Sequence, residues 1–346
     1  MANPERVAVL SDQVAAITDA KIKQIRKVTE ETAILAINAS IEAAHAGTAG
    51  RGFSVVAGAV KVVSERINEI AGDLSRELKS TVVELSHLGT EIGRQMRGER
   101  LSDLAHHMIE IVDRNLYERS CDVRLWATDA AVVGSLESPT PESALHACSR
   151  LGVILSSYTV YLDLWVADRN GRVIANGRPD RYGSVIGTDV SGERWFRDAM
   201  VTQSGDDYVA CDIARSEQLH NAEVAIYSTA VRASGKADGR IIGALGIFFD
   251  WRPQANAVFG GVRMNDEERT RSRCLLIDAQ HRIIAASDQT GVLSETFALQ
   301  IGGRVDFYTD RVSGKQVGFA LTPGYETYPG MGWYGVIIQS SPSQEG

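Results

Sequence analysis

The stretch that decides the fold spans residues 33–57 and reads AILAINASIEAAHAGTAGRGFSVVA. Its first half has the alanine- and isoleucine-rich composition of a helix, and Gly47, Gly50 and Gly52 then follow within six residues. Clustered glycines end helices and permit the left-handed conformations of tight turns. The chain is therefore expected to reverse direction at Gly47–Gly50, with a helix on either side.

Apolar residues recur at alternating spacings of three and four on both sides of this turn. They are Phe53, Val56, Val60, Val63, Ile67, Ile70 and Leu74 after it, and Val7, Leu10, Val14, Ile17, Ile25, Val28, Thr32 and Leu35 before it. This heptad pattern predicts long helices packed against other helices. A reversal near residue 48 pairs positions whose numbers sum to about 97, which places the arms at Pro4–Ala46 and Arg51–Ile92. Because seams rich in Ala and Val bury little surface alone, we expect this antiparallel coiled-coil hairpin to dimerise into a four-helix bundle.

Composition divides the chain near residue 100. The 346 residues include 36 basic and 44 acidic side chains, a net charge of −8. Residues 1–100 hold 13 of each, so the whole negative balance belongs to the remainder. Of the aromatic residues only Phe53 precedes residue 101. The sequence therefore predicts a helical hairpin over residues 1–98 and a domain of different character over residues 99–346.

Several functional classes are disfavoured. No apolar run approaches the roughly 18–20 residues of a membrane span, and the N-terminal residues lack the apolar stretch of a signal peptide. The four cysteines lie far apart, the histidines show no metal-ligand spacing, and no P-loop or GxSxG motif occurs. An acidic balance argues against nucleic acid. We expect a soluble, cytoplasmic protein that is not an enzyme and holds no metal or cofactor.

The C-terminal part contains an internal repeat. A long helix over about 99–133 and a second over about Pro141–Ser157 are followed by short β-like runs. Leu162–Asp168 with Gly171–Asn176, and Cys274–Asp278 with Arg282–Ser287, repeat one pattern at an offset of 110 residues. Each is a β-hairpin whose turn opens with an aspartate. The repeat predicts an α+β fold with two related modules, at about 134–262 and 270–340. Further strands are expected at Tyr208–Ile213, Val224–Arg232, Arg240–Trp251, Gln316–Leu321 and Trp333–Gln339.

The residues around the glycine turn closely resemble the signalling tip of methyl-accepting chemotaxis proteins. The likeness covers some thirty positions and combines NASIEAA with GRGF across the turn. It implies a tip that packs receptor dimers into trimers and docks the histidine kinase CheA and the adaptor CheW. Glu30 and His45 depart from the family pattern, which has Phe and Arg there. The candidate partner-binding residues are Ile34, Ile37, Asn38, Glu42, His45, Arg51, Phe53 and Val55.

Residues 101–340 resemble a double Cache sensor domain, in which two PAS-like modules follow one long N-terminal helix. The first hairpin and the stretch Gly187–Phe196, which reads GTDVSGERWF, carry this likeness. It implies a small ligand held between the sheet and the loop–helix layer. Glu193 and Phe196 stand where amino-acid-binding relatives have Arg and Tyr, which disfavours an amino-acid ligand. The candidate ligand-binding residues are Arg194, Trp195, Tyr208, Asp212, Tyr227 and Asp250.

Each ligand candidate has its own expected role. Trp195 and Tyr208 would wall an apolar slot, Arg194 would clamp a carboxylate, and Asp212 or Asp250 would hold an amine. Residues of the type of Trp195 and Tyr227 are, however, more often part of a core than the wall of a ligand site.

The two resemblances together indicate a chemoreceptor-like transducer that senses a small molecule through the Cache domain and acts on CheA and CheW through the tip. Two alternatives stay open. One is a non-signalling dimeric ligand-binding protein that sequesters the adaptor or the kinase. The other is a Cache module whose coiled coil serves only to dimerise it.

Overall fold

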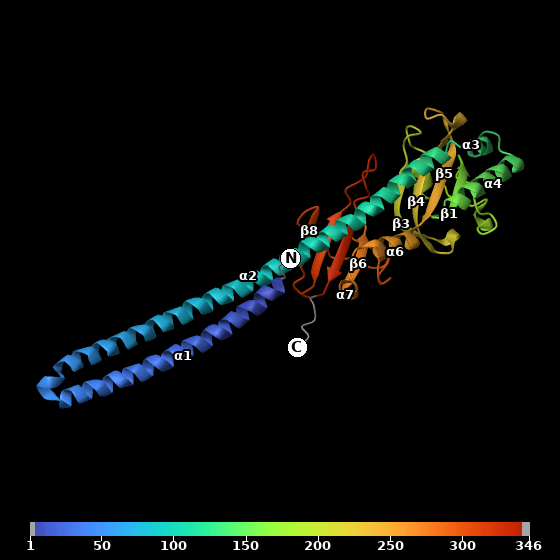
Figure 1. The fold of residues 1–346 in the computed structure, drawn as a ribbon. Helices are drawn as coiled ribbons and strands as arrows, with labels where there is room; N and C mark the ends of the chain where they lie inside the picture. Colours follow the sequence, from blue (N-terminus) through green and yellow to red (C-terminus); the bar gives the residue numbers. More distant parts are fainter. Residues whose placement is uncertain (1–3, 341–346) are drawn as a thin grey trace. The chain divides into compact units, whose positions relative to one another are not determined.

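The computed structural model describes residues 4–340 and divides into two compact units, Met1–Arg97 and Gly98–Gly346 (Figure 1). The first unit is a helical hairpin. The second contains two five-stranded antiparallel sheets together with shorter helices. This is the α+β organisation that the sequence predicts.

The hairpin reverses at the glycine cluster, as predicted. α1 spans Pro4–His45, and α2 begins at Arg51 after the short 3-10 helix η1, Gly47–Gly50. Gly47 has a φ of 61°, a left-handed conformation that residues with a Cβ adopt only at a cost. A Cβ on Gly50 would lie 2.0 Å from the carbonyl oxygen of Ala43. Both glycines are therefore needed for the turn to close.

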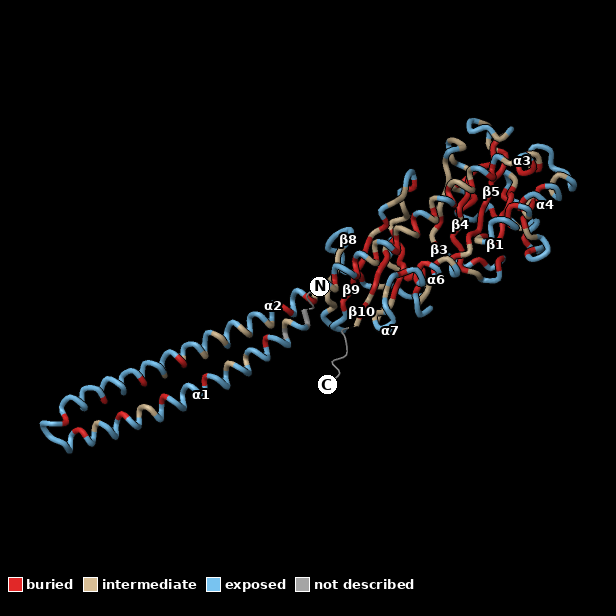
Figure 2. Tube along the Cα trace, in the orientation of Figure 1, coloured by how far each residue is buried: buried red, intermediate tan, exposed pale blue. Residues whose placement is uncertain are grey.

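The two arms meet in the predicted register. The hydroxyl oxygen of Thr29 on α1 lies 2.5 Å from the side-chain oxygen of Asn68 on α2, a hydrogen bond between positions whose numbers sum to 97. Figure 2 shows isolated buried positions along each arm among exposed ones. They are mostly small and recur every seven residues: Ile22, Thr29, Ala36 and Ala43 on α1, and Ala57, Ser64 and Ala71 on α2. Small side chains at this spacing let the two helices approach closely.

The large apolar residues of the sequence pattern do not line this contact. Val63 is 56% exposed, Ile70 is 58% exposed, and Val28 is 60% exposed in the single chain. The heptad pattern therefore marks a second face of the hairpin, distinct from the small-residue seam between its arms.

α2 is longer than the sequence suggested. It runs for 76 residues to Trp126, passing through Gly89, Gly93 and Gly98 rather than ending at Ile92. An interior glycine costs a helix only about 1 kcal/mol relative to alanine, which packing can offset. A Cβ on Gly98 would lie 2.0 Å from the ring of Phe307, so this glycine allows close packing instead of ending the helix. The predicted end of the second arm at Ile92 is wrong.

The C-terminal end of this helix also differs from the prediction, which placed it near residue 133. A separate helix, α3, spans Ala130–Glu137, and Asp129 caps it by accepting a hydrogen bond from the Ala131 N–H at 2.9 Å. The capping aspartate, and not Gly134, marks the boundary. The next helix, α4, spans Pro141–Ser157 as predicted and begins with a Thr140–Ser143 capping box.

The first module is built on a sheet of five strands in the order β2-β1-β5-β4-β3. Asp168 opens the predicted β1–β2 turn by accepting hydrogen bonds from the backbone N–H groups of Asn170 and Arg172. The strands are β1 (Tyr161–Asp168), β2 (Val173–Asn176), β3 (Val209–Ser216), β4 (Ala222–Arg232) and β5 (Ile241–Asp250). The remaining helices are η2 (Gly183–Val185), α5 (Arg194–Ala199), η3 (Glu217–Leu219), η4 (Ala233–Gly235) and α6 (Trp251–Gly261).

The second module repeats this topology in the order β7-β6-β10-β9-β8, which confirms two related modules. Asp278 opens the β6–β7 turn by accepting from the N–H groups of Gln280 and Arg282. β8, which completes the sheet, lies outside the strands predicted from the sequence. The elements are α7 (Asp266–Thr270), β6 (Ser272–Ile277), β7 (Ile283–Ala286), β8 (Val305–Thr309), β9 (Gln316–Leu321) and β10 (Tyr334–Gln339).

Two glycines bring the second sheet against the backbone of α2. A Cβ on Gly318 of β9 would lie 2.5 Å from the backbone of Leu101, and one on Gly335 of β10 would lie 2.6 Å from the carbonyl oxygen of Ala105. Leu101 and Ala105 are buried. At these two glycines the strands therefore contribute no side chain, and their backbones pack directly against α2.

Candidate functional site

The turn of the hairpin displays every side chain that the sequence nominated for partner binding. Phe53 is 76% exposed and Val55 is 74% exposed, which is unusual for large apolar residues. Polar and charged candidates surround them on the same short segment. All eight are exposed: Ile34, Ile37, Asn38, Glu42, His45, Arg51, Phe53 and Val55.

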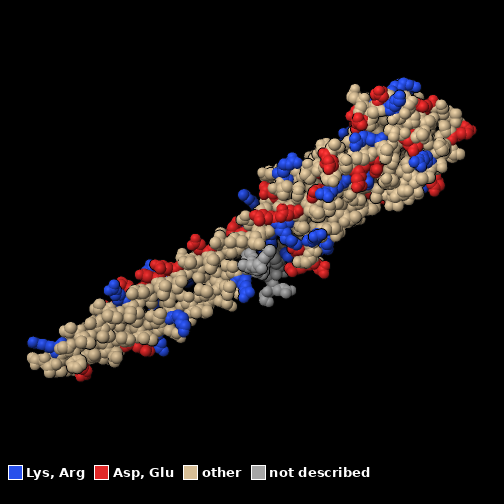
Figure 3. Space-filling view, turned by 45° about the horizontal axis from the view of Figure 1, so that its top comes forward, with Lys and Arg blue, Asp and Glu red and all other residues tan. Residues whose placement is uncertain are grey.

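An apolar face continues from the turn along both arms. A hollow of about 420 Å³ lies between them, and Figure 3 shows broad uncharged surface on the arms between scattered charges. Contiguous exposed apolar surface of this kind marks an interaction site. The hollow is lined by Val28, Thr29, Thr32, Val55, Val56, Ala59, Val60, Val63, Ser64 and Ile67.

In the first module, Trp195 is a buried residue of the layer between the sheet and α5. Its ring centroid lies 5.9 Å from that of Phe248, whose ring lies 3.9 Å from Trp165. A Cβ on Gly246 would lie 2.9 Å from the Trp195 ring, so the ring rests directly on the β5 backbone. Trp195 therefore belongs to the aromatic cluster that packs between α5 and the sheet.

Tyr227 lies on the opposite face of β4. The neighbouring Ser228 donates a hydrogen bond to the Trp195 carbonyl oxygen at 2.8 Å, so Tyr227 must point away from Trp195. Its hydroxyl lies 3.0 Å from that of Tyr328 in the second module, and its ring stacks on Tyr208 at 6.2 Å. The structure thus brings Tyr208 and Tyr227 together and separates both from Trp195.

The charged candidates have other partners. Asp212 accepts a hydrogen bond from the Trp333 indole N–H at 2.9 Å, and Arg194 is paired with Asp198 at 3.2 Å on the exposed side of α5. Asp250 precedes α6, and burial raises the pKa of its carboxyl. The six nominated residues therefore do not converge on one pocket.

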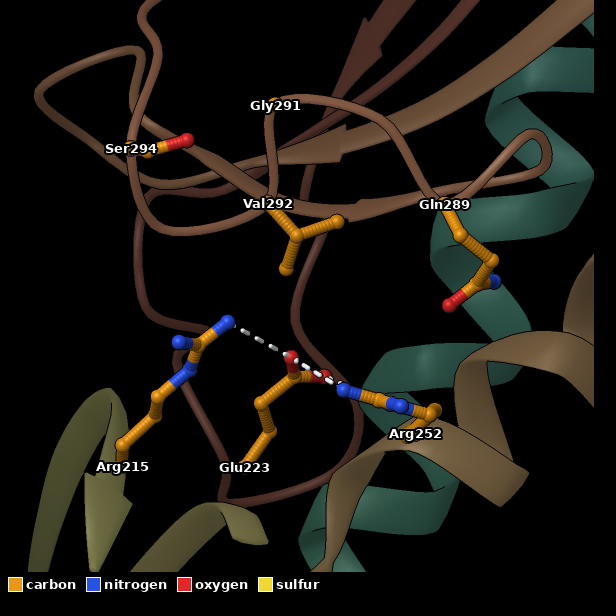
Figure 4. Close-up of a pocket in the computed structure, with 7 residues that line it drawn as sticks. All are labelled: Arg215, Glu223, Arg252, Gln289, Gly291, Val292 and Ser294. Atoms are coloured by element: carbon orange, nitrogen blue, oxygen red, sulfur yellow. Dashed lines mark hydrogen bonds and ion pairs between the residues drawn. The ribbon is translucent and has the colours of Figure 1, made fainter. Parts of the chain in front are cut away.

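A groove that the sequence reading missed lies between the two modules (Figure 4). Two adjoining hollows of about 330 and 410 Å³ share Arg215, Val292 and Ser294, and together they form what we call the intermodule groove. One wall comes from β3, β4 and α6 and the other from the loop 289–294, so no local motif announces it. Its lining residues are Ala214, Arg215, Glu223, Arg252, Arg282, Gln289, Gly291, Val292, Leu293 and Ser294.

An ion-paired group occupies the first-module wall of this groove. The Glu223 side chain is only 4% exposed, and its carboxylate lies between two arginines. Arg252 binds both carboxylate oxygens, at 2.8 and 3.3 Å, whereas the nearest approach of Arg215 is 3.7 Å. Arg282 donates to the Ile213 carbonyl oxygen at 2.9 Å, which ties the second module to β3 beside the groove.

A buried carboxylate, Asp113, and a partly buried one, Asp122, connect α2 to the modules. Asp113 accepts hydrogen bonds from the Thr322 hydroxyl and, at 2.7 Å, from the Gly324 N–H. Asp122 accepts from the Tyr161 hydroxyl at 2.5 Å. Burial raises the pKa of both carboxyls.

The thiols and acidic clusters offer little reactive chemistry. Burial raises the pKa of Cys211 and Cys274 to about 11, so both are protonated at neutral pH. Among residues 4–340 no three His, Cys, Asp or Glu side chains gather in a way that could hold a metal ion. Within the same part of the chain no helix is long and apolar enough to cross a membrane.

Comparison with known proteins identifies the first unit. Residues 3–112 match the methyl-accepting chemotaxis protein (MCP) signalling domain, a domain of non-enzymatic transducers. The chain is 36% identical over 96 residues to a probable methyl-accepting chemotaxis protein of Bacillus thuringiensis, and 33% identical over 121 residues to the biofilm dispersion protein BdlA of Pseudomonas aeruginosa. These segments cover 24% and 30% of this chain but only 15% and 28% of those relatives.

Comparison with solved structures identifies the fold of the second unit. The ligand-binding domain of the Pseudomonas aeruginosa chemoreceptor PctC, solved in complex with GABA, matches with a TM-score of 0.53 at 16% identity, covering 69% of this chain and 98% of that one. The sensor domain of the Vibrio cholerae histidine kinase DctB matches with a TM-score of 0.53 at 12% identity, covering 73% and 98%. At these identities the likeness establishes fold alone. The chain therefore joins an MCP signalling domain at its N-terminus to a C-terminal domain with the double-Cache-like fold of chemoreceptor ligand-binding domains.

Proposed function

We propose that this protein is a chemoreceptor-like transducer, in which the C-terminal domain senses a small molecule and the hairpin tip acts on CheA and CheW. The observation that carries the proposal is the exposed tip on a matched signalling domain. Phe53 and Val55 present apolar surface, and Asn38, Glu42 and Arg51 add directional polar contacts around it.

The exposed apolar face of the arms supports a dimer as the working form. A hairpin whose seam holds mainly Ala, Ser and Thr buries little apolar area by itself, whereas Val63 and Ile70 stay open to water. Burying such side chains against a second copy contributes roughly 1.5–3 kcal/mol each. The expected product is a four-helix bundle, which the family associates further into trimers of dimers.

α2 is the covalent route for a signal. Its residues 51–97 belong to the hairpin unit and residues 98–126 to the sensor unit. Within the sensor unit, Asp113 and Asp122 connect this helix to both modules. A ligand that moves a module against these contacts would displace α2.

The test is capture of purified CheA and CheW by the full chain. Ile37→Arg or Glu42→Ala should reduce capture at least tenfold. Leu145→Arg, at an exposed apolar position on α4, and Glu84→Ala, at an exposed glutamate far from the turn, should leave it unchanged. If neither partner is captured by the wild type, the tip is not a docking site and the coiled coil serves only to dimerise the chain.

A sequestering regulator is the second candidate, and Glu30 favours it. This exposed glutamate, one turn before Ile34, stands where the family has an aromatic residue. A tip that binds CheW without activating CheA would sequester it. Kinase activity in reconstituted arrays distinguishes the two: a transducer raises phosphorylation, whereas a sequestering protein lowers it in proportion to its concentration.

A further inference from the structure

We propose that the intermodule groove binds a small anion that carries a carboxylate or phosphate group. This assigns a site and a ligand class to the sensing role and rests on the proposed function only in that respect. The groove has the size of a small-molecule site, since its two hollows measure about 330 and 410 Å³.

The charge of the groove favours an anion. Its lining contains three arginines, Arg215, Arg252 and Arg282, and the carboxylate of Glu223. Arg252 is paired with Glu223 at 2.8 Å and Arg282 with the buried Asp278 at 2.9 Å, whereas Arg215 is held only loosely. Residues 101–346 as a whole hold 23 basic and 31 acidic side chains, so a weakly paired arginine in a groove of this acidic domain is a site where an anion can compensate a charge.

Arg215 has hydrogen-bonding capacity to spare. Among residues 4–340 its one ionic contact is to Glu223, and that contact is 3.7 Å long, which is beyond ordinary hydrogen-bond length. The side chain is 55% exposed, and the backbone of Arg215 is paired with Glu223 of β4 in the sheet. A guanidinium offers five donors in a planar fork that fits a carboxylate or phosphate. Arg215 is therefore the residue that would bind the anion directly.

Glu223 and Arg252 lie next to the guanidinium of Arg215 and help to position it. The buried carboxylate of Glu223 holds Arg252 through two contacts, so Arg252 presents a fixed positive edge to the groove. Figure 4 shows Val292 and Gln289 pointing from the second module toward this group. The facing loop is held in a tight conformation by Gly291 and Leu293, which have φ of 74° and 59°. An anion seated on Arg215 would thus be enclosed by both modules.

The groove lies where the two modules contact each other, so a ligand bound there can affect how they are arranged. Arg282 lines the groove and also donates to Ile213 of the first module, so the groove lies beside an existing contact between modules. A ligand bridging Arg215 and the loop 289–294 would add a second contact and stabilise one arrangement of the two modules.

Isothermal titration calorimetry on the full chain tests the proposal with inorganic phosphate and malonate as probes, at constant ionic strength. The neutral diamide of malonate is the control ligand. We expect saturable binding of at least one probe, weakened about tenfold or more by Arg215→Gln, because a hydrogen bond to a charged group is worth roughly 1.5–3 kcal/mol. Arg169→Gln, which removes an exposed arginine in the β1–β2 turn, should leave the affinity unchanged.

The two probes distinguish the anion chemistries, since phosphate alone would indicate a phosphorylated ligand and malonate alone a carboxylate. Arg252→Gln serves as a second variant, with circular dichroism to verify folding. The proposal is overturned if neither phosphate nor malonate binds saturably. It is also overturned if Arg215→Gln and Arg252→Gln both leave the affinity unchanged, or if the neutral diamide binds as tightly as malonate. This experiment does not measure capture of CheA and CheW. A groove that does not bind an anion and a tip that does not dock the partners would therefore be recognised separately.

Discussion

The hydroxyl oxygens of Tyr227 and Tyr328 lie 3.0 Å apart in the buried interior between the two modules. Tyr227 belongs to β4 of the first module, and Tyr328 lies between β9 and β10 of the second. Each phenol supplies the other's buried polar partner.

This pair predicts a non-additive effect on stability. Tyr328→Phe leaves the Tyr227 hydroxyl buried without its partner and should lower the free energy of unfolding by about 1–3 kcal/mol. The double variant Tyr227→Phe/Tyr328→Phe removes both groups and should cost less than the sum of the single changes. Urea unfolding of the four proteins measures this difference. Strict additivity would show that the two hydroxyls do not interact.

Gly246 should tolerate no side chain while Trp195 stays in place. A Cβ there would lie 2.9 Å from the Trp195 ring, so Gly246→Ala should destabilise the protein by about 1–3 kcal/mol. Trp195→Phe should recover part of that loss in the double variant. Gly192→Ala is the matched control, because a Cβ there meets nothing within 4 Å. Equal effects of the two glycine changes in thermal unfolding would contradict the packing.

The seam of the hairpin should reject large residues at its buried positions only. Ala36 is 4% exposed between the arms, and Ala39 on the same helix is exposed. Ala36→Leu should push the arms apart and lower helicity and melting temperature, whereas Ala39→Leu should preserve both. Circular dichroism melts compare the two. The seam is misplaced if Ala39→Leu proves the more damaging change.

The exposed face of the arms should control association. Ile70→Lys places a charge in the apolar face that we propose joins two copies, and it should weaken the dimer at least tenfold. Glu69→Lys introduces the same residue at the adjacent exposed position and should have a much smaller effect. Sedimentation velocity over a range of concentrations measures both. A wild-type protein that stays monomeric at high concentration would refute the dimer.

Asp113 should make stability depend on pH in a defined direction. Because burial raises its pKa in the folded protein, the folded state holds its proton more tightly than the unfolded chain. The stabilising contribution of the protonated carboxyl is fully present below about pH 3.8 and is lost as pH rises through the raised folded pKa. Asp113→Asn keeps an acceptor for Thr322 and Gly324 but cannot ionise. Its stability relative to wild type should therefore grow with pH.

Asp310 provides a control of opposite sign. Backbone hydrogen bonds from Ser313 and Val312 lower the pKa of its carboxyl, so its contribution is present above about pH 3.8 and is lost as pH falls through the lowered value. Asp310→Asn should therefore lose stability relative to wild type at neutral pH. Unfolding midpoints from pH 4 to 8 measure both variants. A flat difference for Asp113→Asn would contradict the effect of its burial.

Local chemistry made much of the fold predictable. The glycines at 47 and 50 fixed the reversal because few other residues accept that backbone, and the turn aspartates at 168 and 278 revealed the repeat. The end of the second arm was harder to predict, because a glycine inside a helix and one that ends it look alike until the packed neighbour, Phe307 for Gly98, is known.

The ligand candidates were less predictable because the sequence does not show which side of the sheet each side chain of a strand faces. Trp195 and Tyr227 are both buried aromatics, yet β4 lies between them, and only the Ser228 contact to Trp195 reveals the alternation. The intermodule groove could not be predicted from the sequence for a different reason. Arg215 and Val292 are far apart in the chain and belong to no common motif, so only the tertiary structure brings them to one groove.

Gly318 and Gly335 have a mechanical consequence. Where side chains separate a helix from a sheet, changes of rotamer can absorb a small displacement before it travels further. At these two positions the backbones of β9 and β10 touch α2 near Leu101 and Ala105, so no such slack exists. We therefore expect a displacement of the second sheet to be transmitted directly to this part of α2.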